Sequence, residues 1–140
     1  MTWIGIDPGV HTGFAVWQGG RFAELETFPL HRALLRLLDI ADELGHQNVH
    51  VVFEDARQRK WIPRESSVRE RIGRAQGAGS VKRDCAIWEA VCRDFRIPCT
   101  ATAPKDGTTK LSAEAFAQLT KVGTTTSSHA RDAAMLVFGR

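Results

Sequence analysis

The sequence predicts an α/β fold, with helices on both faces of a mixed five-stranded sheet. Three β-rich runs come first along the chain, and helical and strand-like segments alternate after them. Strands joined by a tight turn pair antiparallel, whereas strands joined through a helix lie parallel in the same sheet. We therefore expect the first three strands to form an antiparallel meander, with the fourth and fifth parallel to the first. A length of 140 residues suits a single domain over residues 1–140.

The N-terminal half supplies the expected meander, one helix and a buried strand. Its three β-rich runs cover residues 2–7, 13–17 and 22–28. Gly19 and Gly20, between the second and third runs, suit a two-residue hairpin turn. Leucine and alanine recur at helical spacing over residues 34–44, and Gly45 can end that helix. The apolar, β-branched run 49–53 predicts a buried strand.

The C-terminal half contains a basic loop, a long helix, a last strand and two further helices. Residues 56–66 are polar and basic and include a proline, which predicts a loop. Residues 67–95 predict one long helix or two broken ones. Three glycines inside it disfavour a helix and suggest a close backbone approach; they are Gly73, Gly77 and Gly79. A strand over 97–102 and helices over 112–122 and 129–138 complete the order.

Composition and cysteine content exclude several classes of protein. Hydrophobic residues make up 43% and charged residues 25% of the chain, as in ordinary globular domains. No apolar run approaches the roughly 20 residues that span a membrane, and the pattern of a signal peptide is absent. Cys85, Cys92 and Cys99 form no C-x-x-C pair, so neither a disulfide framework nor a structural zinc site is expected. We interpret Cys85 and Cys92 as small buried residues in a reducing, cytoplasmic compartment.

The positive charge of the chain is concentrated in one segment. The net charge is only +3, but residues 56–83 carry nine basic and two acidic residues, whereas the remainder carries ten basic and fourteen acidic ones. A basic segment on an acidic body indicates a contact with a polyanion beside a cation site. A solvated loop and helix face would give the same pattern.

Two acidic residues follow strands that we expect to be neighbours in the sheet. Asp7 ends the first strand and Glu54 the fourth, at the edge where open α/β sheets bind ligands. Two adjacent carboxylates repel one another, and a divalent cation between them removes that conflict. Asp55 should point to the opposite face of the sheet and therefore ranks second to Glu54. Taken alone, Asp7 also fits an Asp-Pro-Gly turn in which the carboxylate caps backbone N–H groups.

A histidine and an acid share one face of the last predicted helix. His129 and Asp132 are three positions apart, so both can project from its first turn. An acid favoured by the helix dipole beside an incidental surface histidine is the simpler explanation of this motif alone. Together with Asp7 and Glu54, however, the pair would form an oxygen-rich site suited to Mg²⁺ or Mn²⁺ rather than zinc. Two such ions about 4 Å apart can activate a water and stabilise the leaving oxygen in phosphodiester cleavage.

Four segments together resemble the RuvC-type Holliday junction resolvases, which are ribonuclease H-like nucleases. They are the GIDPG run at 5–9, the apolar strand that ends in Glu54, the GRAQG stretch at 73–77 and the HARDAAML run at 129–136. The resemblance spans nearly the whole chain in the family's order and implies a ribonuclease H-like fold. It further implies a crossover junction endodeoxyribonuclease that acts as a homodimer. Each subunit would nick one of two opposed strands of a four-way DNA junction, leaving 5′-phosphate and 3′-hydroxyl ends.

The resemblance also implies roles for individual residues. Asp7, Glu54 and Asp132 match the family's metal-binding and catalytic carboxylates. His129 matches a position that family members fill with Asp or His, as a metal ligand or a proton-handling group. Two Mg²⁺ ions per active site are implied, for which Mn²⁺ can substitute.

DNA-binding residues are predicted from the basic segment and the resemblance together. They are Arg57, Arg59, Lys60, Trp61, Arg64, Arg74, Lys82, Lys105 and Lys110. The cations would contact phosphates. Trp61 can stack on an unpaired base or serve only as an apolar anchor of its loop.

The short chain and the basic loop after Glu54 look closer to phage-borne relatives, whose branched-DNA specificity can be broader. We therefore expect action in the cytoplasm of a bacterial host. Two other functions stay open. A ribonuclease H-like nuclease acting on RNA or flaps would share the same metal chemistry, and a catalytically silent branched-DNA binder would share the basic segment but has no need of the acids.

An ATPase of the actin or sugar-kinase type is a third alternative. Its first phosphate loop is similar to residues 5–13. The chain is too short for the two domains of that fold and has no second phosphate motif, which argues against it.

Overall fold

The computed structural model describes residues 1–59, 67–105 and 110–140, and for residues 71, 74 and 75 it describes the backbone alone. The strands in this part of the chain are β1 (Thr2–Asp7), β2 (His11–Gln18), β3 (Arg21–Pro29), β4 (Val49–Glu54) and β5 (Cys99–Thr102). The helices are α1 (Leu30–Leu44), α2 (Val68–Asp94), α3 (Ala113–Thr120) and α4 (Ser128–Val137), with short 3₁₀ turns η1 (His46–Asn48) and η2 (Ala56–Gln58). The predicted elements are therefore all present, in the predicted order.

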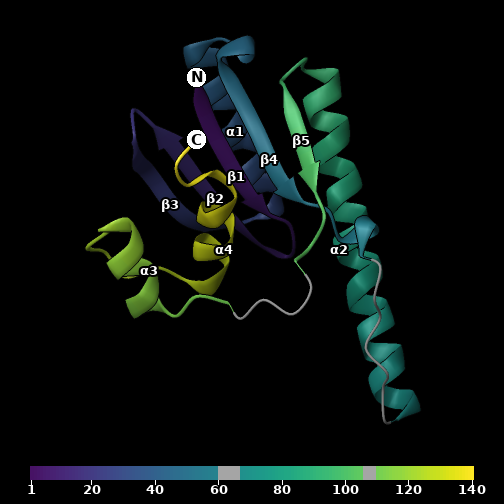
Figure 1. Ribbon diagram of the computed structural model, residues 1–140. Coiled ribbons are helices and arrows are strands. Elements are labelled where there is room, and N and C mark those ends of the chain that lie inside the picture. Colours follow the sequence, from purple (N-terminus) through teal and green to yellow (C-terminus); the bar gives the residue numbers. More distant parts are fainter. Residues whose placement is uncertain (60–66, 106–109) are drawn as a thin grey trace.

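The sheet has the mixed topology that the sequence predicts. Its strand order is β3-β2-β1-β4-β5, with β1, β2 and β3 antiparallel and with β4 and β5 parallel to β1 (Figure 1). The hairpin turn between β2 and β3 uses Gly19 and Gly20 at φ of 58° and 77°, a region that favours glycine. Because β1 and β4 occupy adjacent central positions, their carboxyl ends meet at one edge.

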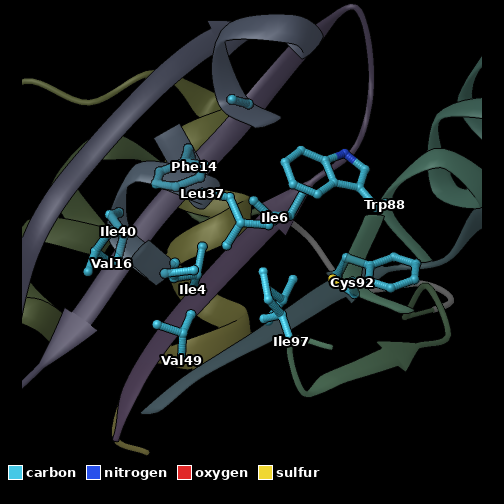
Figure 2. Packing of buried hydrophobic residues seen from close by; sticks show 14 of the residues in the cluster. Ile4, Ile6, Phe14, Val16, Leu37, Ile40, Val49, Trp88, Cys92 and Ile97 are labelled. Atoms are coloured by element: carbon cyan, nitrogen blue, oxygen red, sulfur yellow. The ribbon is translucent and has the colours of Figure 1, made fainter. Parts of the chain in front are cut away.

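Helices cover both faces of the sheet and create two apolar layers (Figure 1). On one face, α1 and α2 bury side chains such as Leu37 and Trp88 against Ile4, Ile6 and Val49 (Figure 2). A second apolar cluster joins α3 and α4 to the other face of the sheet. Its buried members are Ala15, Trp17, Val52, Phe116, Ala133, Ala134 and Val137. β4 is therefore buried on both sides, as its continuous apolar sequence requires.

One helix and one strand begin at other residues than the sequence predicts. α1 begins at Leu30 rather than at residue 34, directly after Pro29, whose φ of −58° already suits a helix start. Gly45 ends it with φ of 89°, and its N–H donates to the carbonyl of Ala41 at 2.8 Å. β5 begins at Cys99 rather than at residue 97, although Ile97 is buried in the core.

α2 is one continuous helix of 27 residues, and its N-terminal half runs beyond the sheet (Figure 1). Ser67 caps its start by accepting from the backbone N–H of Glu70 at 3.1 Å. The expected close backbone approach at the three glycines is wrong. A Cβ built at Gly73, Gly77 or Gly79 would meet no described atom within 4 Å. Each of these glycines therefore has open space beside it among the described atoms.

The cysteines and the helices agree with the composition. Cys85 and Cys92 are buried without a disulfide, as predicted, and Cys99 is exposed. Over the described ranges, no helix combines the length and the apolar character needed to cross a membrane.

Candidate metal-binding and catalytic site

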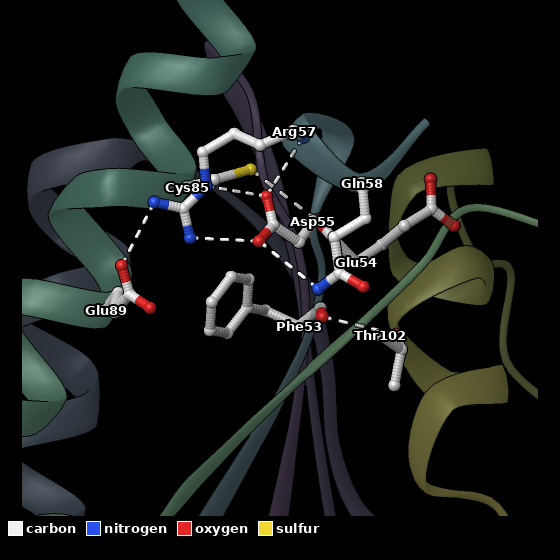
Figure 3. A network of polar contacts seen from close by, with 8 residues as sticks. All are labelled: Phe53, Glu54, Asp55, Arg57, Gln58, Cys85, Glu89 and Thr102. Carbon is white, nitrogen blue, oxygen red and sulfur yellow. Dashed lines mark hydrogen bonds and ion pairs between the residues drawn. The ribbon is translucent and has the colours of Figure 1, made fainter. Parts of the chain in front are cut away.

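The parallel pairing of β1 with β4 places Asp7 beside Glu54. Ile6 is the register partner of Phe53, so the next residue of each strand is an acid at the same sheet edge. Both side chains face the side of the sheet that α4 covers, because they share the parity of Gly5 and Val52. Figure 3 shows Glu54 extending toward α4 while Asp55 extends toward α2. The predicted juxtaposition of Asp7 with Glu54, and the opposite orientation of Asp55, are confirmed.

Glycines in β1 and β2 allow α4 to lie directly on the sheet. A Cβ at Gly13 would lie 2.0 Å from the carbonyl oxygen of His129 and 3.0 Å from the Cβ of Asp7. A Cβ at Gly5 would lie 2.0 Å from the carbonyl oxygen of Ala133. Since Gly13 is also the register partner of Asp7, the start of α4 is held directly above that acid. The sequence argument missed this role, although glycine inside a strand pattern is itself a sign of close backbone approach.

His129 lies over Asp7 at the first turn of α4. The helix is capped by Ser127, whose hydroxyl accepts from the backbone N–H of Ala130 at 3.0 Å. His129 Nδ1 is 3.0 Å from Asp7 Oδ2 and donates to it. The imidazole is thus oriented by the carboxylate, which leaves its other nitrogen for a ligand or a proton.

Asp132 carries its own cationic partner. Its Oδ2 accepts from the ammonium of Lys110, a residue that the sequence had assigned to DNA binding. Arg131 holds this arrangement together by donating to the carbonyl of Leu111 at 3.2 Å and to the carbonyl of Thr126. The sequence offered no signal for Arg131, because its main acceptors are backbone carbonyls, which no residue type marks.

The carboxylates of this site influence one another through space. Burial raises the pKa of Asp7 above its ordinary value, the hydrogen bond from His129 opposes this, and the charge of Asp132 adds to it. Burial likewise raises the pKa of Glu54, followed by the charge of Asp7, while Lys110 opposes the shift. The hydrogen bond to Asp132 raises the pKa of Lys110, and the charges of Asp7 and Glu54 also favour its protonation. Burial is thus the main cause of the raised pKa of Asp7 and of Glu54, and the charge of Asp132 acts on both.

The donor set suits a hard divalent cation, but it is not assembled around one point. Among the described residues, no three His, Cys, Asp or Glu side chains are grouped closely enough to hold a metal ion as they stand. Two of the three carboxylates are instead occupied, Asp7 by His129 and Asp132 by Lys110. Carboxylate oxygens with unrelieved mutual repulsion are the ligands that Mg²⁺ and Mn²⁺ prefer. The residues fit such an ion once Lys110 releases Asp132.

The other predicted DNA-binding residues differ in their exposure and in their ion pairs. Arg59, Lys82 and Lys105 are exposed. Arg57 is bound to two carboxylates, those of Asp55 and Glu89. The remaining predictions lie outside the described residues or side chains: Lys60, Trp61, Arg64 and Arg74.

A cavity of about 830 Å³ lies elsewhere, between β3 and the segment 120–125. None of the acids at the ends of β1, β4 or α4 lines it. The acidic site therefore lies outside this cavity, at the carboxyl ends of β1 and β4.

Comparisons with known proteins identify the fold. No protein-family model matches the chain, and no curated protein matches its sequence. Among solved structures, the chain is similar to T. thermophilus RuvC in complex with a Holliday junction substrate. The identity is 19%, the match covers 99% of this chain and 91% of that chain, and the TM-score is 0.57. The architecture is therefore the mixed, ribonuclease H-like α/β fold of RuvC, as the sequence predicted.

Proposed function

We propose that the chain is a metal-dependent, structure-specific endodeoxyribonuclease that resolves four-way DNA junctions by paired nicks. The observation that supports this proposal is the placement of Asp7 beside Glu54 at the ends of β1 and β4, where the charge of Asp132 on α4 acts on both carboxylates. The likeness to RuvC supports it through the fold. Neither feature is needed by a protein that only binds DNA.

The three carboxylates would hold two Mg²⁺ ions, with His129 as a fourth ligand or as a proton carrier. When bound, such ions supply an activated water and stabilise the leaving oxygen of a phosphodiester. His129 is oriented for a proton-handling role because its Nδ1 is engaged by Asp7. Lys110 neutralises Asp132 in the free protein. Once released from Asp132, the ammonium of Lys110 could bind a scissile phosphate at the same sheet edge.

The exposed cations near the acidic edge would position the DNA. Arg59 and Lys82 are exposed and make no ion pair with another described residue, so they can reach phosphates, and Lys105 is exposed as well. Such contacts fix orientation on the substrate but carry no sequence information. Lys60, Trp61, Arg64 and Arg74 are proposed to extend the same surface.

A homodimer would supply the second nick. The projecting half of α2 exposes the apolar side chains of Val68 and Ile72, which could pack against a second copy. The concentration of basic residues after Glu54 also favours a phage-type enzyme that accepts several branched DNAs in the bacterial cytoplasm.

A nicking assay tests the proposed function directly. The purified chain is incubated with Mg²⁺ and a mobile four-way junction, a fork, a flap, a linear duplex or an RNA–DNA hybrid. We expect symmetric nicks in the junction that disappear in Asp7→Asn. Equal cutting of all DNA substrates would remove the junction assignment, and cutting of the hybrid alone would indicate an RNA-directed nuclease. Junction binding without nicking in either Mg²⁺ or Mn²⁺ would contradict the enzymatic assignment.

A further inference from the structure

We propose that Arg57 is a positioning residue that sets the metal affinity of the site by tying the strand end around Glu54 to helix α2. It would not act as a phosphate contact. This inference rests on the proposed function, because it concerns the same metal site. It differs from that function in assigning a role to residues on the opposite face of the sheet.

The contacts of Arg57 form a two-sided bridge. Its Nε and Nη2 donate to the two oxygens of Asp55 at 2.8 and 2.9 Å, and its backbone N–H adds a third bond to that carboxylate at 3.0 Å (Figure 3). Its Nη1 donates to Glu89 of α2 at 3.0 Å. The paired geometry on Asp55 is the strong, directional form of an arginine–carboxylate contact. One guanidinium therefore joins η2, the end of β4 and α2.

The backbone that presents Glu54 is held from both sides. The Thr102 hydroxyl donates to the carbonyl of Phe53 at 3.2 Å, and the N–H of Asp55 donates to the carbonyl of Thr102 at 2.7 Å. The Cys85 thiol of α2 donates to the carbonyl of Glu54 at 3.6 Å. A shift of α2 relative to β4 would thus act on the peptide groups on either side of Glu54 (Figure 3). The carboxylate of Glu54, in contrast, accepts no hydrogen bond from any residue that the structure describes.

Arg57 is poorly suited to a phosphate contact because three of its five N–H donors, one on each nitrogen, are bound to carboxylates. Its side chain is 32% exposed, and Nε, Nη1 and Nη2 all point at carboxylates. Asp55 is only 4% exposed, so a phosphate that drew Arg57 away would leave a buried charge without its partner. Arg59, two residues later, is exposed, and its side chain makes no ion pair with another described residue.

The bridge also connects the acidic edge to the helix that carries proposed DNA contacts. α2 holds Glu89 in its C-terminal half and the exposed Lys82 nearer its middle. If bound DNA displaced α2, the displacement would be passed to Glu54 through the contacts of Glu89, Arg57 and Asp55. Small displacements matter here, because metal ligands need to be held within a fraction of an ångström.

The test measures Mn²⁺ binding to the whole chain by titration calorimetry, without DNA. We expect Arg57→Gln to weaken Mn²⁺ binding about tenfold, as losses of supporting contacts around metal sites do. Arg57→Lys should recover only part of the loss, because lysine cannot make the paired contact. Glu89→Gln should give a smaller loss, and adding it to Arg57→Gln should cost nothing more.

Arg36→Gln is the matched control. Arg36 makes the same kind of paired contact with Glu24, at 2.7 to 3.2 Å, on the β3 side of the sheet away from β4. Its loss should leave Mn²⁺ affinity unchanged. In nicking assays, Arg57→Gln should lower kcat at a fixed Mn²⁺ concentration with little change in KM for the junction. A phosphate contact would instead raise KM and leave Mn²⁺ affinity intact.

The outcomes separate this inference from the proposed function. If the wild-type chain shows no Mn²⁺ binding that Asp7→Asn removes, the proposed metal site is wrong and the inference is overturned with it. If the wild-type chain binds Mn²⁺ and folded Arg57→Gln binds it equally well, the inference alone is overturned. Should Arg57→Gln fail to fold, Glu89→Gln decides the question, since it keeps the Arg57–Asp55 pair.

Discussion

Glu54 and Asp55 are consecutive acids on opposite faces of the sheet, and their environments are opposite as well. Asp55 is the more buried, yet hydrogen bonds from Arg57 hold its pKa below the ordinary value. Burial and the charge of Asp7 raise the pKa of Glu54. The supply of cationic partners, rather than burial, therefore distinguishes a structural carboxylate from one available to a ligand. On one face Arg57 neutralises Asp55, whereas on the other face the carboxylate of Glu54 stays available to the proposed metal ions.

The two faces also differ in how their helices are attached near this edge. α4 contacts the sheet through backbone atoms at Gly5 and Gly13. α2 is joined to the strand end by side chains, chiefly those of Arg57 and Glu89. A side chain at either glycine would overlap the backbone of α4, whereas the side-chain contacts of α2 can be removed one at a time by substitution.

The largest expected effect is on the acidic face. Asp7→Asn should reduce nicking of a four-way junction by more than about a hundredfold, because it removes a proposed metal ligand rather than a supporting group. Junction binding in a gel-shift assay should survive, since the cations that hold phosphates are unchanged. Loss of both activities together would indicate that Asp7 has a structural role.

The attachment of α4 provides the next largest effect. Gly13→Ala should lower the free energy of unfolding by about 1–3 kcal/mol or more, because its methyl group would overlap the carbonyl of His129. It should also displace His129 and reduce nicking. Gly79→Ala is the control on α2, where open space and helix propensity predict a gain of up to about 1 kcal/mol. Chemical denaturation measures both, and equal stability of the two variants would contradict the close packing of α4.

The opposite pKa shifts predict opposite pH dependences in the metal-free protein. The lowered pKa of Asp55 gives stability that is present above its unfolded value and lost as pH falls through the folded value. The raised pKa of Glu54 gives stability that is present in acid and lost as pH rises through the folded value. At neutral pH, Asp55→Asn should therefore destabilise the fold by about 1–3 kcal/mol, whereas Glu54→Gln should stabilise it.

Urea denaturation near neutral pH and below about pH 4, where unfolded carboxylates become protonated, checks both variants. Both effects should shrink in acid. Effects of the same sign at neutral pH would mean that the two faces do not differ as described.

The smallest effect concerns the exposed cations. Lys82→Gln should weaken junction binding modestly and reduce the slope of log affinity against log salt by about one, as loss of a single phosphate contact does. Arg36→Gln, at the β3 end of the strand order, should leave the slope unchanged. An unaltered slope in Lys82→Gln would remove that residue from the DNA surface.

Much of this comparison is predictable from sequence because it follows from strand parity and topology. Two apolar strands that end in acids, once parallel neighbours, must place Asp7 by Glu54 and turn Asp55 away. The approach of α4 could not be predicted in the same way, because Gly5 and Gly13 act through space that only the folded chain defines. Arg57 was assigned to DNA from its basic surroundings. Its partner Glu89 is distant in sequence, so the charge pattern alone could not reveal the ion pair.

Crystals soaked in Mn²⁺ test the central claim most directly, because the anomalous signal locates the ion without reference to activity. The account predicts Mn²⁺ between the carboxylates of Asp7 and Glu54, with Asp132 turned toward it and Lys110 released. Crystals that bind Mn²⁺ only at other positions, with the Lys110–Asp132 pair intact, would contradict it.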